Sequence, residues 1–435
     1  MGELWSNWAG QQVCAPARVE RPGSEDELAE TVAKAAAEGR GVRPVGSGHS
    51  FTDTCLTDGV MIDQTHMQRL LDVDTATGRV TVEAGIKLHT LTAELARHGL
   101  ALENQGDIDA QSLAGALATA THGTGARFRN LSAQVLGCRL VTASGEVLEI
   151  DEASDPDAWR AARVSLGALG VISQYTLQCV PAFRIHRIDE PRPIREVLAH
   201  LDELVEGHDH FEMLALPHTD TALTLASRRT DEPADPPGRF EAWLNDDFVP
   251  NTVVGALAGL GRRVPTQVPR IARLMARVAG RYEQLDASHR VFAHDRRVRF
   301  TEMEYAIPRE HLAEAFSRVM AVIADRRLPV LFPIEVRFTA ADDAFLSTAH
   351  GRETGYIAVH QVVGAEFETY FRAVEAIMDD YDGRPHWGKR HYQTAATLAP
   401  RYPGWEAFAA VRAHLDPEGV FTNDYVRRVL GPPSV

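Results

Sequence analysis

Residues 43–52 of this 435-residue chain are RPVGSGHSFT, a glycine-rich loop that follows a short apolar strand and carries one histidine. Gly46 and Gly48 have no Cβ, so the backbone can approach a ligand closely, and exposed N–H groups in such a loop suit phosphate oxygens. The loop is not a GxGxxG motif, because Phe51 replaces the third glycine, and it lacks the serine of a GxSxG nucleophile elbow. Taken alone, a plain turn with an exposed histidine is the slightly better interpretation.

The length and composition of the chain limit the possible protein classes. A chain of 435 residues predicts two or three domains, and 44% hydrophobic with 24% charged residues is typical of a soluble globular protein. The net charge of −15 argues against nucleic acid as a partner. The four cysteines form no CxxC pair, so we expect neither disulfides nor zinc, and a cytoplasmic protein. We expect no signal peptide and no membrane span.

Hydrophobic periodicity predicts helices and strands that are mixed rather than alternating in βαβ order. In the first half we expect strands at 42–45, 60–63, 79–83 and 171–177, a hairpin within 140–150 and a helix at 88–97. In the second half we expect strands at 329–338 and 356–361 and a helix at 367–378. This order predicts an α+β fold with a mixed or antiparallel sheet.

A second stretch rich in small residues is SLAGALATATHGTG at 112–125. Small side chains let a large planar or phosphate-bearing ligand lie against the backbone, and the hydroxyl groups supply donors. A tightly packed Ala/Gly helix is an equally good interpretation of this stretch alone. Two glycine-rich loops, each with a histidine, favour a nucleotide cofactor.

Two groups of polar residues in the second half could carry chemistry. Strand alternation places Glu335 and Arg337 on one face, where they form either a structural ion pair or a site that polarises a polyhydroxylated substrate. His360 on the next strand could face the same space. The segment RPHWGKRHY at 384–392 is either a basic surface loop or an anion or substrate site. Four arginines at 270–281 recur at helical spacing, which favours a solvated helix side.

Together these motifs resemble the aldonolactone oxidoreductases of the vanillyl-alcohol-oxidase flavoprotein superfamily. The resemblance covers essentially the whole chain and rests on WSNWAG, GSGHSF, ATATHGTG, TEMEYAIP, PIEVRF, GRPHWGKRH and DPEGVFTNDY. It implies a PCMH-type FAD-binding domain at residues 1–181. It also implies an α+β cap domain with an antiparallel sheet at 182–435, whose segment from about 384 onward returns to the flavin.

The resemblance further implies which residues hold FAD and that His49 is bonded covalently to the 8α-methyl of the flavin. A neutral imidazole can attack that carbon when nearby donors stabilise the developing charge. The other implied cofactor-binding residues are Val45, Gly46, Ser47, Gly48, Ser50, Gly106, Asp107, Ser112, Gly115, Thr119, Thr121, His122, Gly123, Val171 and His386.

The activity implied by the resemblance is oxidation of the secondary alcohol of an aldono-1,4-lactone, of the L-gulono-1,4-lactone type, by hydride transfer to flavin N5. Arg337 and Lys389 would polarise the hydroxyl, Glu335 would orient the sugar, and His386 and His360 would assist. Oxygen, a cytochrome or a quinone would accept the electrons, and Gly106 would not block oxygen sterically. An alditol oxidase is the alternative; a non-redox phosphate-binding protein or hydrolase is a more distant one.

Overall fold

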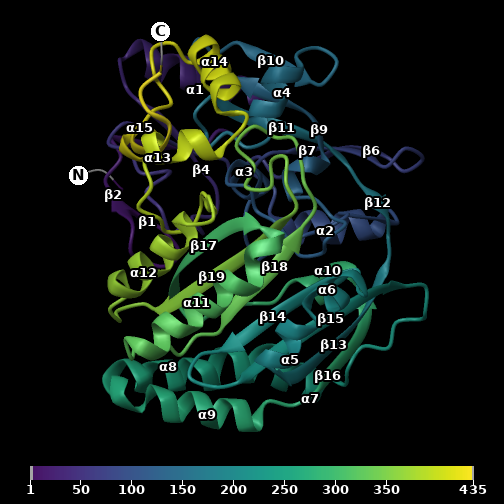
Figure 1. Cartoon of the computed structure of the whole chain (residues 1–435). Helices are drawn as coiled ribbons and strands as arrows, with labels where there is room; N and C mark the ends of the chain where they lie inside the picture. The colour runs from purple at the N-terminus through teal and green to yellow at the C-terminus, as the bar shows by residue number, and fades with distance from the viewer. Residues whose placement is uncertain (1–2, 434–435) are drawn as a thin grey trace.

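The computed structural model describes residues 3–433 and contains two large antiparallel sheets joined to a small parallel one. Figure 1 shows the N-terminal elements in purple and blue above an extended sheet drawn in teal and green. This arrangement confirms the predicted α+β class. The three-stranded parallel sheet has the order β3 (Arg18–Glu20), β5 (Val60–Asp63), β4 (Val42–Val45). The five-stranded sheet has the order β10 (Val147–Asp151), β9 (Val135–Val141), β11 (Val171–Gln178), β7 (Arg79–Glu83), β6 (Leu70–Asp74).

The largest sheet has eight strands, which come from the chain after residue 183. Its four N-terminal strands are β16 (Tyr282–Ala287), β13 (Arg184–Pro193), β15 (Thr221–Thr230) and β14 (His210–Leu216). The order continues with β18 (Ile334–Thr339), β19 (Thr354–Val362), β17 (Phe300–Pro308) and β20 (Arg384–Pro385). Buried apolar residues of α11 (Leu312–Asp325) and α12 (Glu368–Asp379) pack against one face of this sheet. That face is the apolar one, so the opposite face is available for polar side chains.

Most elements predicted from periodicity are present. The helix expected at 88–97 is α2 (Leu88–Arg97), and the hairpin within 140–150 is the antiparallel pair of β9 and β10. The strand expected at 329–338 was wrong in its first half, because β18 begins only at Ile334. Pro329 and Pro333 lack the N–H group that a central strand must donate to its neighbours.

The end of the chain completes the core of the N-terminal half. Tyr425, Val426 and Val429 of α15 (Asp424–Leu430) are fully buried in the same apolar cluster as Val80 and Leu117. In Figure 1 the yellow C-terminal helices accordingly lie among the purple and blue elements at the top. The residues before them, at the end of the large sheet, are thereby held close to the glycine-rich loop.

Arg43 ties three distant segments together beneath that loop. Its guanidinium is fully buried and donates to the carbonyl oxygens of Thr54, Leu166, Gly167 and Phe421 at 2.5–2.9 Å. Burial without a carboxylate partner lowers the pKa of Arg43 to about 10, so it still carries its charge at neutral pH. A buried cation paired only with carbonyl oxygens is costly to replace, because every acceptor would lose its donor.

We expect Arg43→Met to lower the free energy of unfolding by roughly 3 kcal/mol or more, because several buried carbonyl groups would be left without donors. Urea denaturation followed by circular dichroism measures this loss. The same change at Arg40, three residues earlier and exposed, is the matched control and should cost less than about 0.5 kcal/mol. Equal losses for the two variants would contradict the role assigned to Arg43.

Candidate active site

An open cavity lies between the two glycine-rich segments. Its lining includes nine of the predicted cofactor-binding residues, namely Val45, Gly46, Ser47, Gly48, His49, Ser50, Ser112, Gly115 and Thr119. Loop residues 46–50 follow β4 directly, and α3 (Leu113–Ala118) begins with Ser112 as its N-cap. The structure therefore supports both interpretations of the Ala/Gly stretch, because a short packed helix is followed by an irregular loop at 119–125.

The two segments meet at a contact that only glycine permits. A Cβ added to Gly46 would lie 2.0 Å from Ser112 Oγ, a distance that no side chain can adopt. Gly48 has a φ of +67°, which L side chains rarely take, and its position lies against the Trp5 ring. The backbone of the loop can thus line the cavity directly with its N–H and C=O groups.

His49 lines this cavity, and its ring is largely buried. The indole of Trp8 stacks on it with ring centroids 5.6 Å apart. Burial, with a smaller contribution from Lys87, lowers the pKa of His49 to about 4. The imidazole is therefore neutral at pH 7 and has a free lone pair, as a nucleophilic nitrogen requires.

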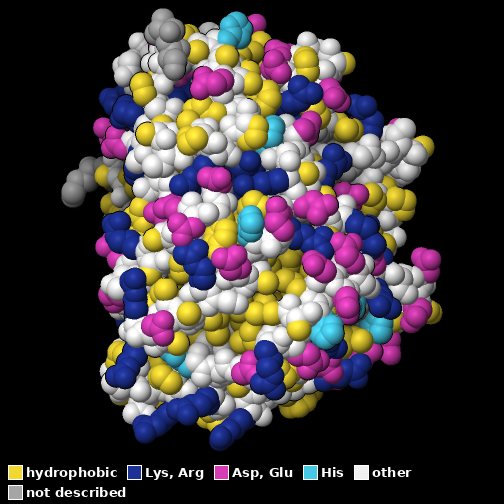
Figure 2. All heavy atoms as spheres, viewed as in Figure 1, with side chains coloured by type: hydrophobic (Ala, Val, Ile, Leu, Met, Phe, Trp, Pro, Cys, Tyr) yellow, Lys and Arg dark blue, Asp and Glu magenta, His cyan; other side chains and the backbone are white. Residues whose placement is uncertain are grey.

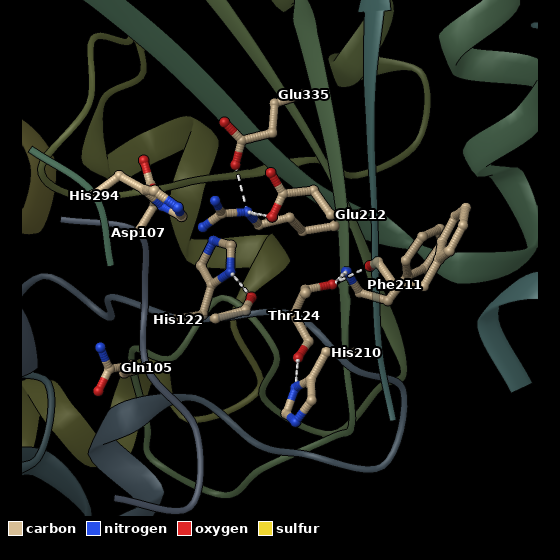
Figure 3. A network of polar contacts seen from close by, with 12 residues as sticks. Gln105, Asp107, His122, Thr124, His210, Phe211, Glu212, His294 and Glu335 are labelled. Atoms are coloured by element: carbon tan, nitrogen blue, oxygen red, sulfur yellow. Dashed lines mark hydrogen bonds and ion pairs between the residues drawn. The ribbon is translucent and has the colours of Figure 1, made fainter. Parts of the chain in front are cut away.

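The polar face of the large sheet contains an arginine held between two carboxylates. Arg337 Nε contacts Glu335 on the same strand and lies 3.0 Å from Glu212 on β14. Figure 3 shows Glu335 and Glu212 reaching the same guanidinium group. Its Nε–H has no aligned hydrogen bond among the described residues, so the pairing is mainly electrostatic. Burial opposes the charge, but the two carboxylates raise the pKa of Arg337, and its terminal nitrogens remain able to donate to a ligand.

A lysine lies on the same face between two further carboxylates. Lys389 Nζ lies 2.5 Å from Glu302 and also contacts Glu304, both on β17. His360, directly opposite Glu302 on β19, contacts it at 3.2 Å. Burial opposes the charged form of the lysine, but the carboxylates raise its pKa, while the lysine and His360 hold the pKa of Glu302 at about 2. Lys389 and the two carboxylates are therefore ionised at neutral pH.

Two histidines connect this lysine group with the second glycine-rich loop. His122 contacts Glu304 through Nε2, and its ring stacks on Tyr356 with centroids 3.6 Å apart. Burial and then Lys389 lower the pKa of His386 to about 3, and its Nδ1 accepts a hydrogen bond from Gly388 N–H. His386 is thus neutral and can donate through Nε2.

The other predicted cofactor residues lie between the cavity and the sheet face or away from both. Gly106, Thr121, His122 and Gly123 belong to two adjoining loops, since a Cβ on Gly106 would lie 3.0 Å from the His122 carbonyl oxygen. The Asp107 carboxylate is occupied by His294 at 2.9 Å and Arg296 at 3.0 Å. The Val171 side chain is fully buried in the core, whereas its neighbours Gly170 and Ile172 line the cavity.

Sequence reasoning assigned Glu335 but missed the other three carboxylates that hold the two cations, Glu212, Glu302 and Glu304. Glu302 and Glu304 lie within the quoted motif TEMEYAIP, and their alternation along β17 gives the same signal that identified Glu335 and Arg337. Glu212 alternates with apolar residues on β14 in the same way. Only the fold shows that their partners, 85 or more residues away, lie beside them.

Comparison with known proteins gives a consistent result along the whole chain. Residues 175–429 match the family described as D-arabinono-1,4-lactone oxidase, and residues 16–151 match the FAD binding domain. The chain belongs to the D-arabinono-1,4-lactone oxidase family. It is 59% identical to L-gulono-1,4-lactone dehydrogenase of Mycobacterium tuberculosis, covering 99% of this chain and 100% of that protein. It is 36% identical to bovine L-gulonolactone oxidase over 99% and 98% of the two chains.

A solved structure shows that the fold is shared more widely. Cholesterol oxidase from B. sterolicum superposes with a TM-score of 0.83, at 18% identity, over 99% of this chain and 97% of that one. At this identity the likeness shows the fold alone, which is the PCMH-type FAD-binding fold predicted from the motifs. The predicted family and fold class are confirmed.

Burial, only partly offset by Arg337, raises the pKa of Glu212 from 4.5 to about 7. A carboxyl group whose folded pKa is raised stabilises the protein below its unfolded pKa, and this stability is lost as the pH rises toward the folded value. Between pH 4.5 and 7.5 we therefore expect the free energy of unfolding of the wild-type protein to fall by on the order of a few kcal/mol. The free energy of unfolding of Glu212→Gln should not show this fall. Urea unfolding across this pH range measures the difference, with the exposed Glu152→Gln as control. Parallel pH profiles for wild type and Glu212→Gln would refute it.

Proposed function

We propose that this protein is an FAD-dependent oxidoreductase that oxidises the secondary alcohol of an aldono-1,4-lactone of the L-gulono-1,4-lactone type. The observation that carries the proposal is the pair of buried cations, Arg337 and Lys389, on the sheet face beside the glycine-rich loops. A neutral, polyhydroxylated lactone brings no negative charge, so the cations that donate hydrogen bonds to it must be neutralised by the protein itself. Each cation here is already balanced by carboxylates and keeps N–H groups to offer.

The residues present fit FAD. The cavity combines the glycine-rich backbone of residues 46–50 with small side chains of α3, which suits a pyrophosphate between two close segments. On the second loop, Thr121 Oγ1 is buried without a hydrogen-bond partner among the described residues. Buried polar groups normally have a partner, which supports a bound ligand as the partner of this hydroxyl. Residues 46–50 would hold the pyrophosphate, and 119–123 with His386 would line the ring system.

Within this proposal His49 is the attachment point of the cofactor, through the 8α-methyl of the flavin. A neutral, largely buried imidazole that lines the cavity supports that role, because only the unprotonated nitrogen is a nucleophile. Trp8 limits the orientations of the ring by stacking on it. A covalent link keeps the cofactor in place and leaves the substrate chemistry to the opposite face.

When bound, FAD supplies an acceptor for the hydride that leaves the substrate carbon. The chain must then hold the lactone and polarise its hydroxyl, whose proton would pass to a carboxylate of the sheet face or to solvent as the hydride leaves the carbon. Arg337 and Lys389 lower the pKa of a hydroxyl that they contact, and they stabilise the negative charge that develops on its oxygen. Glu335 accepts hydrogen bonds from neighbouring hydroxyls, while His360 and His386 complete the wall around them.

The remaining assignments complete the proposal. Residues 1–181 would bind FAD and residues 182–435 the substrate, with 384–435 returning to the flavin. The electrons would pass to oxygen, a cytochrome or a quinone, to which Gly106 leaves steric access. The four cysteines are free, which supports a place in the cytoplasm.

The covalent link can be tested by acid precipitation of the purified protein. We expect the yellow, fluorescent flavin to remain in the wild-type pellet and to appear in the supernatant of His49→Ala. His98→Ala, an exposed histidine of the same half, serves as control and should retain flavin in the pellet. A colourless wild-type pellet with free flavin in solution would refute the link and leave FAD binding intact.

The role of the sheet face can be tested by anaerobic reduction of the bound flavin. We expect Arg337→Met to slow reduction by L-gulono-1,4-lactone by roughly 10²–10⁴-fold, because polarisation of the hydroxyl is lost. Arg337→Lys should recover part of the rate, since it restores the charge but not the planar fork. Stopped-flow absorbance with a lactone and with xylitol measures both effects. Faster reduction by xylitol than by any lactone would replace the proposed substrate with an alditol.

A further inference from the structure

Residues 248–282 differ in charge from the rest of the molecule. They contain six arginines and no aspartate or glutamate, in a chain whose net charge is −15. Asp247 and Glu283 are the acidic residues that end the run. The run includes α8 (Val254–Arg263) and α9 (Val268–Val278), together with the adjoining turns.

Most of this positive charge is not neutralised within the molecule. Within residues 3–433, five of the six arginines make no ion pair, and only Arg281 pairs with a carboxylate, that of Glu283 at 2.7 Å. Arg270 instead bonds to Gln267, and Arg273 bonds to a carbonyl oxygen of its own helix. These five arginines are exposed and have no carboxylate partner among the described residues, so their charge is available to something outside the molecule.

This run and the segment just before it also carry an excess of exposed apolar side chains. Among residues 3–433, ten large hydrophobic residues are exposed, and seven of them lie between residues 240 and 278. The seven are Phe240, Trp243, Val249, Leu260, Val264, Leu274 and Val278. Scattered exposed hydrophobic residues are normal, but a concentration of this kind indicates an interaction site.

On α9 the charged and apolar residues share the outer face. Val268, Ile271 and Ala272 are buried against the protein. Arg270, Leu274, Arg277 and Val278 follow the i, i+4, i+7, i+8 spacing of a single helix face, and Leu274 and Val278 are 54% and 74% exposed. Figure 1 shows α8 and α9 at the lower edge of the molecule, and Figure 2 shows dark blue side chains along that edge.

We propose that this edge, formed by α8, α9 and the residues around them, binds the surface of a membrane that contains anionic lipids. Arginines would contact the headgroups, and the exposed leucine, valine and aromatic side chains would enter the interface, as in peripheral amphipathic helices. No helix among residues 3–433 is long and apolar enough to cross a bilayer, so the contact is peripheral. The acidic remainder of the protein is repelled by such a surface, which leaves this edge as the part that approaches it.

Other occupants fit these observations less well. A second copy of the chain would bring its own arginines against these ones and add repulsion. An acidic protein would satisfy the arginines, but it would not by itself explain the exposed apolar residues between them. An anionic bilayer satisfies both features at once.

Sedimentation of the full-length holoprotein with vesicles tests the proposal. We expect the protein to pellet at low salt with phosphatidylcholine vesicles that contain about 30 mol% phosphatidylglycerol, and to be released from them at high salt. Replacing Arg270, Arg273 and Arg277 together with glutamine should weaken partitioning on the order of 100-fold. Leu274→Ser/Val278→Ser should weaken it as well, with less dependence on salt. Neither variant should change lactone turnover in solution, which reports the fold.

The matched control removes the same charge elsewhere. Arg97, Arg195 and Arg427 are exposed arginines on α2, α5 (Ile194–Ala199) and α15, and their change to glutamine should leave partitioning nearly unchanged. The proposal is overturned if wild type does not pellet with anionic vesicles at low salt, which would leave an acidic protein as the partner. It is also overturned if the control weakens binding as much as the α9 variant, or if light scattering shows a dimer that Leu274→Ser/Val278→Ser dissociates.

Discussion

The close approach of two backbone segments at Gly46 is the constraint on which the rest of the site depends. A single methyl group there would overlap Ser112 Oγ at 2.0 Å. The contact holds the loop after β4 against the start of α3, two segments 66 residues apart, and so defines the two walls of the cavity. The serine hydroxyl already accepts the N–H of Gly115, so it cannot move away without uncapping the helix. The spacing of the two cavity walls is thus set by the packing of these two segments.

The opposite wall follows a different physical rule, the balance of buried charge. Arg337 lies between Glu335 and Glu212, and Lys389 lies between Glu302 and Glu304. Burial of an unpaired cation is costly, so the carboxylates beside Arg337 and Lys389 are what makes two charged groups tolerable on this sheet face. Burial, with a smaller contribution from the neighbouring Glu335, raises the pKa of Glu212, so this group holds its proton more tightly than an ordinary glutamate. With four carboxyl groups against two cations, this face has no excess of positive charge, which suits a neutral sugar better than an anion.

The sequence contains much of this arrangement, but not all of it. Local rules suffice for the glycine loop, for α2 and for the alternation that separates Glu335 and Arg337 from Val336, because each depends on neighbours in the chain. They fail where partners are distant. Nothing near Glu302 indicates that Lys389, 87 residues later, will lie 2.5 Å away, since that contact depends on the pairing of β17 with β20. The strand expected from residue 329 failed for a local reason, because two prolines outweighed the apolar pattern.

The arginines of α9 show how one pattern changes meaning once its surroundings are known. From spacing alone, a solvated helix side is the better interpretation, and the structure does place these side chains in solvent. What spacing does not show is that Leu274 and Val278 share their face and that acidic partners are missing. A solvated face normally carries charges of both signs. It also carries few large apolar groups, because each exposed apolar group costs free energy in water. The face of α9 has neither property. It therefore resembles an interface more closely than a solvated surface, and it lies at the opposite end of the molecule from β4 and α3, which line the cavity.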